Sequence, residues 1–300
     1  MALKYVKFVL DGQTYDLSYD AGSGQWKGTI TAPSKSSFPE NEDHKFHGTV
    51  NVEDLAGNQS QATVDQFPEL GLRVLEKTAP VISVTYPTDS ALISTPTPTI
   101  QWTVTDDGSG IKKDTIKLQI DSQPEITTGI NTVETAGGWT CTYTPAAPLD
   151  DGAHTIRFFV EDNDGNLAPE TSVSVTVDTV PPTLNVTSPE DNLITNNPTL
   201  TVAGTTSDTT SSPVTVEVKV GAGEFVPAQV QEGGAFSVEV SLVEGLNTVT
   251  VKATDRASKS TTVERSVTLK TNAPQVTSVS LVPNPVDAGQ TYVITVTVTE

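Results

Sequence analysis

The sequence is poor in cysteine, positive charge and long apolar runs. Its one cysteine, Cys141, cannot form a disulfide within the chain, so the folded parts must be held by their cores. No run is long enough to span a membrane, and the first residues lack the apolar stretch of a signal peptide. Lys and Arg number 17 against 37 Asp and Glu, a formal net charge of −20. Because such a surface repels phosphate backbones, we do not expect nucleic-acid binding. Because no apolar run is long enough, we do not expect membrane insertion either.

What the sequence does contain is a repeat. Thr, Val, Ser, Gly and Pro are abundant, which is typical of short strands joined by tight turns. One turn recurs as Glu53-Asp54-Leu55-Ala56-Gly57-Asn58, Glu161-Asp162-Asn163-Asp164-Gly165-Asn166 and Thr254-Asp255-Arg256-Ala257-Ser258-Lys259. The aspartates give periods of 162 − 54 = 108 and 255 − 162 = 93 residues. A period of that size corresponds to one small β-sandwich per repeat.

The middle repeat is the most complete. Alternating apolar residues predict seven strands in it, one of them a short strand near residues 126–130, and seven is the strand number of an immunoglobulin-like sandwich. Prolines at positions 80, 181, 182 and 274 would stiffen the junctions. The sequence therefore predicts an all-β fold of tandem immunoglobulin-like antiparallel β-sandwiches in an elongated array.

Aligning the repeats predicts where each domain begins and ends. Residues 78–178 and 179–270 form two sandwiches, and residues 1–77 form a partial sandwich that lacks its first two strands. Residues 271–300 supply the first two strands of a further module. Three interpretations stay open. Residues 271–300 donate strands to another copy, or a different protein completes the open sandwich, or the ends are where the chain was cut or where a smaller variant sandwich begins.

Several motifs resemble those of bacterial immunoglobulin-like (fibronectin-III-like) modules. They are the Asp-x-Ala-Gly-Asn turn, the Ala-Thr-Asp-x-Ala turn, the Asp-Thr-x-Pro-Pro boundary at 178–182, and Ser188-Pro-Glu-Asp-Asn192. Residues 282–290, with the strand that follows, resemble Gram-positive prophage structural proteins.

The resemblance implies a non-enzymatic phage tail or virion component that acts as a spacer or cell-surface-binding scaffold. The alternatives are a fragment of a bacterial surface adhesin and the accessory domains of a secreted polysaccharide-degrading enzyme. Its implied location is the virion or the cell exterior. Its expected partners are other structural proteins or cell-surface glycans, with head-to-tail self-association through residues 271–300 as a further hypothesis.

No catalytic or cofactor-binding constellation is visible in the sequence. The cation that the loops fit best is calcium, whose oxygen donors would come from Asp106, Asp107, Asp162, Asp164 and Asp178, with Asn166. The favoured interpretation is that these side chains bond their own turns, so no metal site is predicted.

The apolar side chains on the predicted strands are assigned to the cores. Cys141 is interpreted as a small buried residue, because it alternates with Trp139 and Tyr143. Trp26, Trp102 and Trp139 are interpreted as core residues rather than as platforms for sugars.

Overall fold

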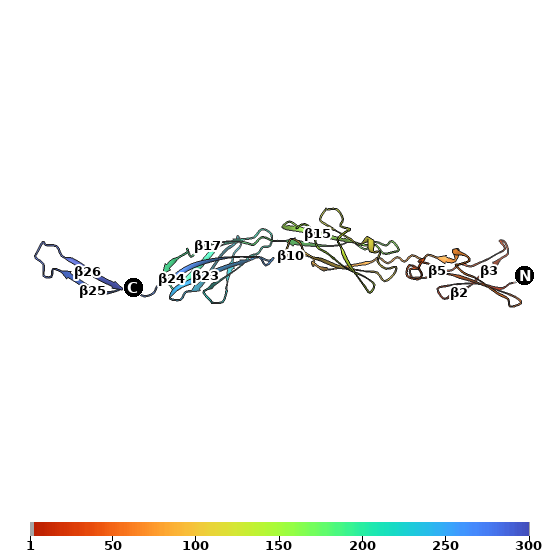
Figure 1. The fold of residues 1–300 in the computed structure, drawn as a ribbon, viewed down its shortest axis with the longest axis horizontal. Coiled ribbons are helices and arrows are strands. Elements are labelled where there is room, and N and C mark those ends of the chain that lie inside the picture. Colours follow the sequence, from red (N-terminus) through yellow and green to blue (C-terminus); the bar gives the residue numbers. More distant parts are fainter. Residues whose placement is uncertain (1–2, 300) are drawn as a thin grey trace. The chain divides into compact units, whose positions relative to one another are not determined.

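The computed structural model describes residues 3–299, and its strands follow the alternation of apolar and polar residues (Figure 1). In β11 (Ile100–Thr105), Ile100, Trp102 and Val104 are fully buried, whereas the residues between them face outward to differing degrees. A strand places successive side chains on opposite faces, so this pattern puts one face of the sheet into a core. We call β1 to β8 module 1, β9 to β16 module 2, and β17 to β24 module 3.

Module 1 is built on a four-stranded antiparallel sheet of order β2-β1-β6-β7. Two short pairs, β3 with β4 and β5 with β8, complete it. Strand β6 pairs with β1 and β7, just as β15 (Gly152–Phe159) of module 2 pairs with β12 (Lys117–Ile120) and β16 (Thr171–Val177). The elements are β1 (Leu3–Leu10), β2 (Gln13–Asp16), β3 (Ser18–Asp20), β4 (Gln25–Lys27), β5 (Phe46–His47), β6 (Thr49–Asp54), β7 (Gln59–Ala62), β8 (Gly71–Leu72) and the 3-10 helix η1 (Pro68–Leu70).

Module 2 consists of two four-stranded sheets, of order β10-β16-β15-β12 and β13-β14-β11-β9. The ring centroids of Trp102, from one sheet, and Phe158, from the other, lie 5.2 Å apart in the core. The strand predicted near residues 126–130 is wrong: Ile126 forms a single bridge to Leu118, and the strand lies later, as β13. The elements are β9 (Val81–Tyr86), β10 (Ala91–Ile93), β11 (Ile100–Thr105), β12 (Lys117–Ile120), β13 (Asn131–Thr135), β14 (Gly138–Tyr143), β15 (Gly152–Phe159), β16 (Thr171–Val177) and the 3-10 helix η2 (Lys113–Thr115).

Module 3 consists of one eight-stranded sheet, of order β17-β19-β22-β21-β20-β23-β24-β18. The sheet wraps around a core that is rich in valine, including Val202, Val218, Val249 and Val251, all without exposed surface. Strand β18 runs parallel to β24, and the other pairs are antiparallel. The strands are β17 (Thr183–Ser188), β18 (Leu193–Thr195), β19 (Thr199–Ser207), β20 (Thr215–Val220), β21 (Val226–Val230), β22 (Ala235–Ser241), β23 (Gly245–Thr254) and β24 (Ser260–Leu269).

Strands β25 (Gln275–Val282) and β26 (Val293–Thr299) form an antiparallel hairpin. Its apolar side chains are exposed, among them Val279 at 60% and Val296 at 49%.

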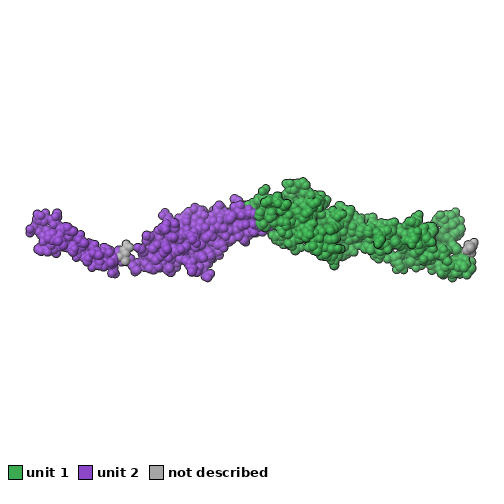
Figure 2. Space-filling view, in the orientation of Figure 1, with its two compact units in different colours: residues 1–91, 95–177 green, residues 92–94, 178–300 purple. Residues whose placement is uncertain are grey.

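The predicted domain boundaries after residues 77, 178 and 270 stay predictions, and residues 1, 2 and 300 of the predicted terminal domains lie outside the described residues. The chain forms two compact units, residues 1–91 with 95–177 and residues 92–94 with 178–300 (Figure 2). Between residues 3 and 299, no helix has the length and apolarity that crossing a bilayer requires.

The tryptophan prediction is only partly correct. Trp102 is fully buried, whereas Trp26 and Trp139 are only partly buried, so the assignment to the core is confirmed for Trp102 alone. Trp26 contacts Tyr19 across the β3–β4 pair, and the Lys113 ammonium lies over the Trp139 ring at 4.6 Å. The burial predicted for Cys141 is confirmed, since it has no exposed surface.

Candidate metal centres

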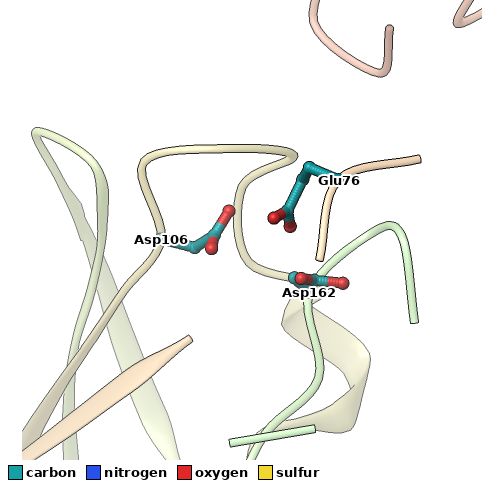
Figure 3. A group of neighbouring side chains, drawn as sticks. All are labelled: Glu76, Asp106 and Asp162. Carbon is teal, nitrogen blue, oxygen red and sulfur yellow. The ribbon is translucent and has the colours of Figure 1, made fainter. Parts of the chain in front are cut away.

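Three carboxylates come together at one end of module 2 (Figure 3). Glu76, Asp106 and Asp162 each offer an oxygen atom, and these atoms all lie within 4.8 Å of one another. Glu76 stands five residues before β9, Asp106 directly follows β11, and Asp162 opens the turn after β15. In the view of Figure 3, the Glu76 carboxylate lies between the other two. We call these residues the first acidic cluster.

Asp106 divides its two oxygens between a turn and the cluster. Its Oδ2 accepts the backbone N–H groups of Gly108 at 3.1 Å and Gly110 at 2.7 Å. Its Oδ1 has no hydrogen-bond partner and is buried, since only 7% of the residue is exposed. The turn therefore accounts for one carboxylate oxygen and leaves the other unexplained.

Asp162 is bonded through both oxygens. Its Oδ1 accepts the backbone N–H groups of Asp164 and Asn166, each at 2.8 Å, and its Oδ2 accepts Nδ2 of Asn166 at 2.7 Å. Burial raises the pKa of Asp162, but the bonds from Asn166 outweigh burial and leave that pKa below its ordinary value. At Glu76, burial and the neighbouring Asp162 both raise the pKa. Without a cation, therefore, Glu76 takes up a proton more readily than Asp162 does.

Two of the predicted oxygen donors, Asp164 and Asp107, do not belong to this cluster. Asp164, whose side chain has no exposed surface, forms an ion pair with Arg73, and its Oδ2 accepts the backbone N–H of Glu76 at 2.9 Å. Asp107 is exposed and lies outside the cluster. The Asn166 side chain donates to Glu76 Oε1 at 3.1 Å as well as to Asp162.

A second cluster of the same kind lies in module 3. It consists of Asp178, Asp208 and Asp255, whose ligand atoms also lie within 4.8 Å of one another. Oδ2 of Asp178 accepts the Ser211 hydroxyl, and Oδ1 of Asp208 accepts the backbone N–H of Ser211 at 2.7 Å. Oδ1 of Asp255 accepts the backbone N–H of Lys259 at 2.9 Å, whereas its Oδ2 is buried without a partner. We call these three aspartates the second acidic cluster.

The two clusters occupy equivalent positions in their modules. Asp178 stands five residues before β17, as Glu76 does before β9 (183 − 178 = 81 − 76 = 5). Asp208 directly follows β19 and corresponds to Asp106, and Asp255 directly follows β23 and corresponds to Asp162. The acidic cluster therefore recurs at the same three positions in modules 2 and 3.

Module 1 has the turn without the cluster. Asp54 corresponds to Asp162 and makes the same bonds: Oδ1 accepts the N–H groups of Ala56 at 2.8 Å and Asn58 at 2.9 Å, and Oδ2 accepts Nδ2 of Asn58 at 2.9 Å. Among residues 3–299, the groupings of three or more potential ligands do not include Asp54. The turn motif alone therefore satisfies its aspartate fully.

Each cluster concentrates negative charge in a partly buried volume. At the effective dielectric constant of about 20 that suits such sites, two carboxylates 4.8 Å apart repel each other by about 3 kcal/mol. A proton on one member relieves part of that repulsion, and a cation relieves more of it. The donors are all oxygens, the chemistry of a hard cation rather than of zinc, which prefers nitrogen and sulfur.

The sequence identified half of this arrangement. Of the candidate donors, Asp106 and Asp162 meet in the first acidic cluster and Asp178 belongs to the second, whereas Asp107 and Asp164 belong to neither. The sequence reasoning missed Glu76, Asp208 and Asp255. Comparing positions relative to the strands, rather than searching for turn motifs, could have found them.

Comparisons with known proteins give three adjacent matches. Residues 8–68 and 76–179 each match a family described as bacterial Ig-like domain, and residues 182–271 match glucodextranase, domain B. The chain is 27% identical over 175 residues to Bacillopeptidase F of Bacillus subtilis (strain 168), a match that covers 57% of this chain and 12% of that protein.

Solved structures with similar folds include the fibronectin(III)-like modules of Clostridium thermocellum CbhA and domains A168–A170 of titin. The first is 20% identical with a TM-score of 0.38, covering 63% of this chain and 94% of that one. The second is 15% identical with a TM-score of 0.41, covering 87% and 86%. With the sheets described above, the family matches confirm the predicted all-β class and the tandem immunoglobulin-like domains.

Proposed function

We propose that this chain of tandem immunoglobulin-like domains is a non-enzymatic structural part of an extracellular bacterial protein, where it spaces other domains or binding surfaces. The observation that supports this proposal is the succession of the three family matches. They follow one another from residue 8 to residue 271 and leave only residues 69–75 and 180–181 between them. A fold of this kind carries many functions, so the proposal depends on the arrangement of the modules rather than on the fold alone.

Within this proposal we favour the role of accessory modules beside a catalytic domain. One match carries the name of a glucodextranase domain, and the relative in Bacillus subtilis is named as a peptidase. The phage tail or virion role has its support in the prophage-like sequence of residues 282–290. A surface adhesin is the third form of the same structural role.

The location separates these roles. Peptides of this chain are expected by mass spectrometry in the culture medium or the cell-wall fraction of the source bacterium, joined in one polypeptide to a catalytic domain. Their recovery from purified virions instead would overturn the accessory role and establish the virion role.

The absence of enzymatic activity needs a test of its own. The purified chain is expected to release no product from dextran, starch or casein. Hydrolysis by the wild-type chain that disappears with Asp106→Asn would contradict the proposal, because a contaminating enzyme would not follow that substitution.

We also propose that binding surfaces lie at exposed loops or at the β25–β26 hairpin, with cell-surface glycans or other structural proteins as ligands. Self-association through residues 271–300 is tested with the full chain by sedimentation at increasing concentration. If the hairpin mediates it, Val279→Asp with Val296→Asp, a cross-strand pair, abolishes the oligomers. Oligomers that persist in this variant exclude the hairpin as the contact.

A further inference from the structure

We propose that each of the two acidic clusters binds one calcium ion. This inference goes beyond the structural role proposed above, because a spacer of immunoglobulin-like domains needs no cation. Its basis is the combination of the clustered carboxylates with two buried oxygen atoms that the protein leaves without partners.

The unpartnered oxygens are the first argument. Among residues 3–299, three buried side-chain nitrogen or oxygen atoms have no hydrogen-bond partner. One is Nε1 of Trp102, and the other two are Oδ1 of Asp106 and Oδ2 of Asp255, one in each acidic cluster. Asp106 is 7% exposed and Asp255 is 6% exposed. A buried carboxylate oxygen without a partner is costly, and a coordinated cation removes that cost.

Local turn chemistry does not explain these two atoms. At Asp54, which has the same turn as Asp255 but belongs to no acidic cluster, each oxygen accepts at least one hydrogen bond. At Asp255, the residue that donates a side-chain amide in the other turns is replaced by Lys259, so Oδ2 loses that bond. Ser258 takes the left-handed conformation (φ 67°) that glycine provides in the other copies, so the turn itself is kept. The fold thus keeps Asp255 in place while leaving its second oxygen for another partner.

The donor set favours calcium. Calcium binds six to eight oxygens at 2.3–2.6 Å, so two of its ligands lie at most about 5 Å apart, and the ligand atoms of each cluster meet that limit at 4.8 Å. Three carboxylates from three separate loops suit the flexible coordination of calcium, with water and backbone carbonyls left to complete the shell. Magnesium demands near-octahedral geometry and usually keeps most of its water, using one or two carboxylates.

The proposed ions would act on the start of each module. In module 2 the ion would hold Glu76, before the first strand, against the loops that begin at Asp106 and Asp162. In module 3 it would hold Asp178 against the loops that begin at Asp208 and Asp255. The three segments of each cluster are distant in sequence, so each ion would add a direct link between them to the hydrogen bonds that already join them.

The test is calcium titration of the full chain by calorimetry after removal of metals with a chelator. We expect two sites per chain, with dissociation constants at or below about 1 mM, the upper end for extracellular modules. Asp106→Asn and Asp255→Asn should each remove one site or weaken it by at least tenfold, because each removes a charged ligand. Asp54→Asn is the control matched to Asp255→Asn, since it alters the same turn outside any cluster, and it should leave both sites intact.

Thermal stability provides a second readout, because it also shows whether a variant that binds no calcium is folded. All three tryptophans, Trp26, Trp102 and Trp139, lie in the first compact unit, so their fluorescence follows unfolding there, and calorimetry follows both units. Calcium at 10 mM should raise the melting temperature of the wild type and of Asp54→Asn by at least about 3 °C. In chelator, Asp106→Asn and Asp255→Asn should melt at or above the wild-type temperature, because each removes one of three repelling charges.

Four results would overturn the proposal. They are no calcium binding by the wild type up to 10 mM, equal binding by all the variants, loss of binding with Asp54→Asn, and binding of magnesium as tight as that of calcium. Should Asp106→Asn or Asp255→Asn fail to fold in either buffer, Glu76→Gln and Asp208→Asn remove a ligand from the same clusters at less buried positions.

Discussion

Replacing Arg73 by alanine should destabilise the first compact unit through the loss of one ion pair. The Arg73 guanidinium contacts the Asp164 carboxylate, which has no exposed surface, and Nη1 of Arg73 also donates to Ser37 Oγ at 2.9 Å and to the Val74 carbonyl at 3.1 Å. The same side chain lies over the ring of Phe38, at 5.6 Å. One residue therefore joins module 1 to the turn of module 2.

The expected loss follows from the exposure of the two partners. Removing one partner of a fully buried ion pair costs about 3–5 kcal/mol, because the remaining charge is left uncompensated. Since the Arg73 side chain is 31% exposed, water can partly replace it. We therefore expect Arg73→Ala to lower the free energy of unfolding by about 2–3 kcal/mol.

The assay is urea unfolding in the presence of chelator, followed by tryptophan fluorescence, which reports on the first unit alone. Lys27→Ala is the control: it breaks the exposed pair with Asp20 and should leave the midpoint unchanged. The double variant Arg73→Ala with Asp164→Asn should recover part of the lost stability, because it removes the stranded charge. If the double variant is as unstable as the sum of the two single variants, the reasoning from an uncompensated charge is refuted.

Three further predictions concern the interior of module 2. Burial raises the pKa of the Cys141 thiol to about 11. Cys141 should therefore resist thiol reagents at pH 8 until urea unfolds the unit, and rapid labelling of the folded chain would contradict this. The contribution of Cys141 to stability should be lost as pH rises from 9 towards 11. Burial lowers the pKa of His154, but the Asp150 carbonyl and the Asp121 carboxylate outweigh it, so NMR titration should give a folded pKa above 6.5. The stabilisation by His154 is then complete below about pH 6.5 and lost as pH rises through the folded pKa, and a lower pKa in the folded chain than in urea would refute it. Trp102→Ala should cost about 3–5 kcal/mol and Trp102→Phe clearly less, because phenylalanine keeps the contact with Phe158 and removes an unpartnered N–H; equal costs by urea unfolding would count against this reading of the core.

The sequence predicted the strands better than the core. Alternation in residues 100–105 correctly placed Trp102 inside, because that face of β11 is covered by the opposite sheet. The same pattern did not predict that Trp26 and Trp139 are only partly buried, because alternation shows which side chains share a face but not what covers it. The β3–β4 pair that carries Trp26 forms a sheet of two strands, and the Lys113 ammonium lies over the Trp139 ring.

The acidic clusters show a different limit of sequence reasoning. Asp106 and Asp162 stand out because each begins a recognisable turn, but a turn motif alone predicts a satisfied aspartate, as Asp54 shows. Glu76 lies in no motif, and only the fold brings it to the other two. A site made from three loops of one module depends on strand register and length, which a single sequence does not determine.

The parallel pairing of β18 with β24 has a mechanical consequence for module 3. These strands stand near its beginning and its end, and three residue pairs, from Leu193 with Val267 to Thr195 with Leu269, connect them. The backbone N–H of Lys270 extends the ladder by donating to the Thr195 carbonyl at 2.8 Å. If the two ends of the module are pulled apart, the strands must slide along each other, so these bonds are loaded in shear and have to break together rather than one after another. Tension applied to the two ends of module 3 would therefore load this short patch of backbone hydrogen bonds.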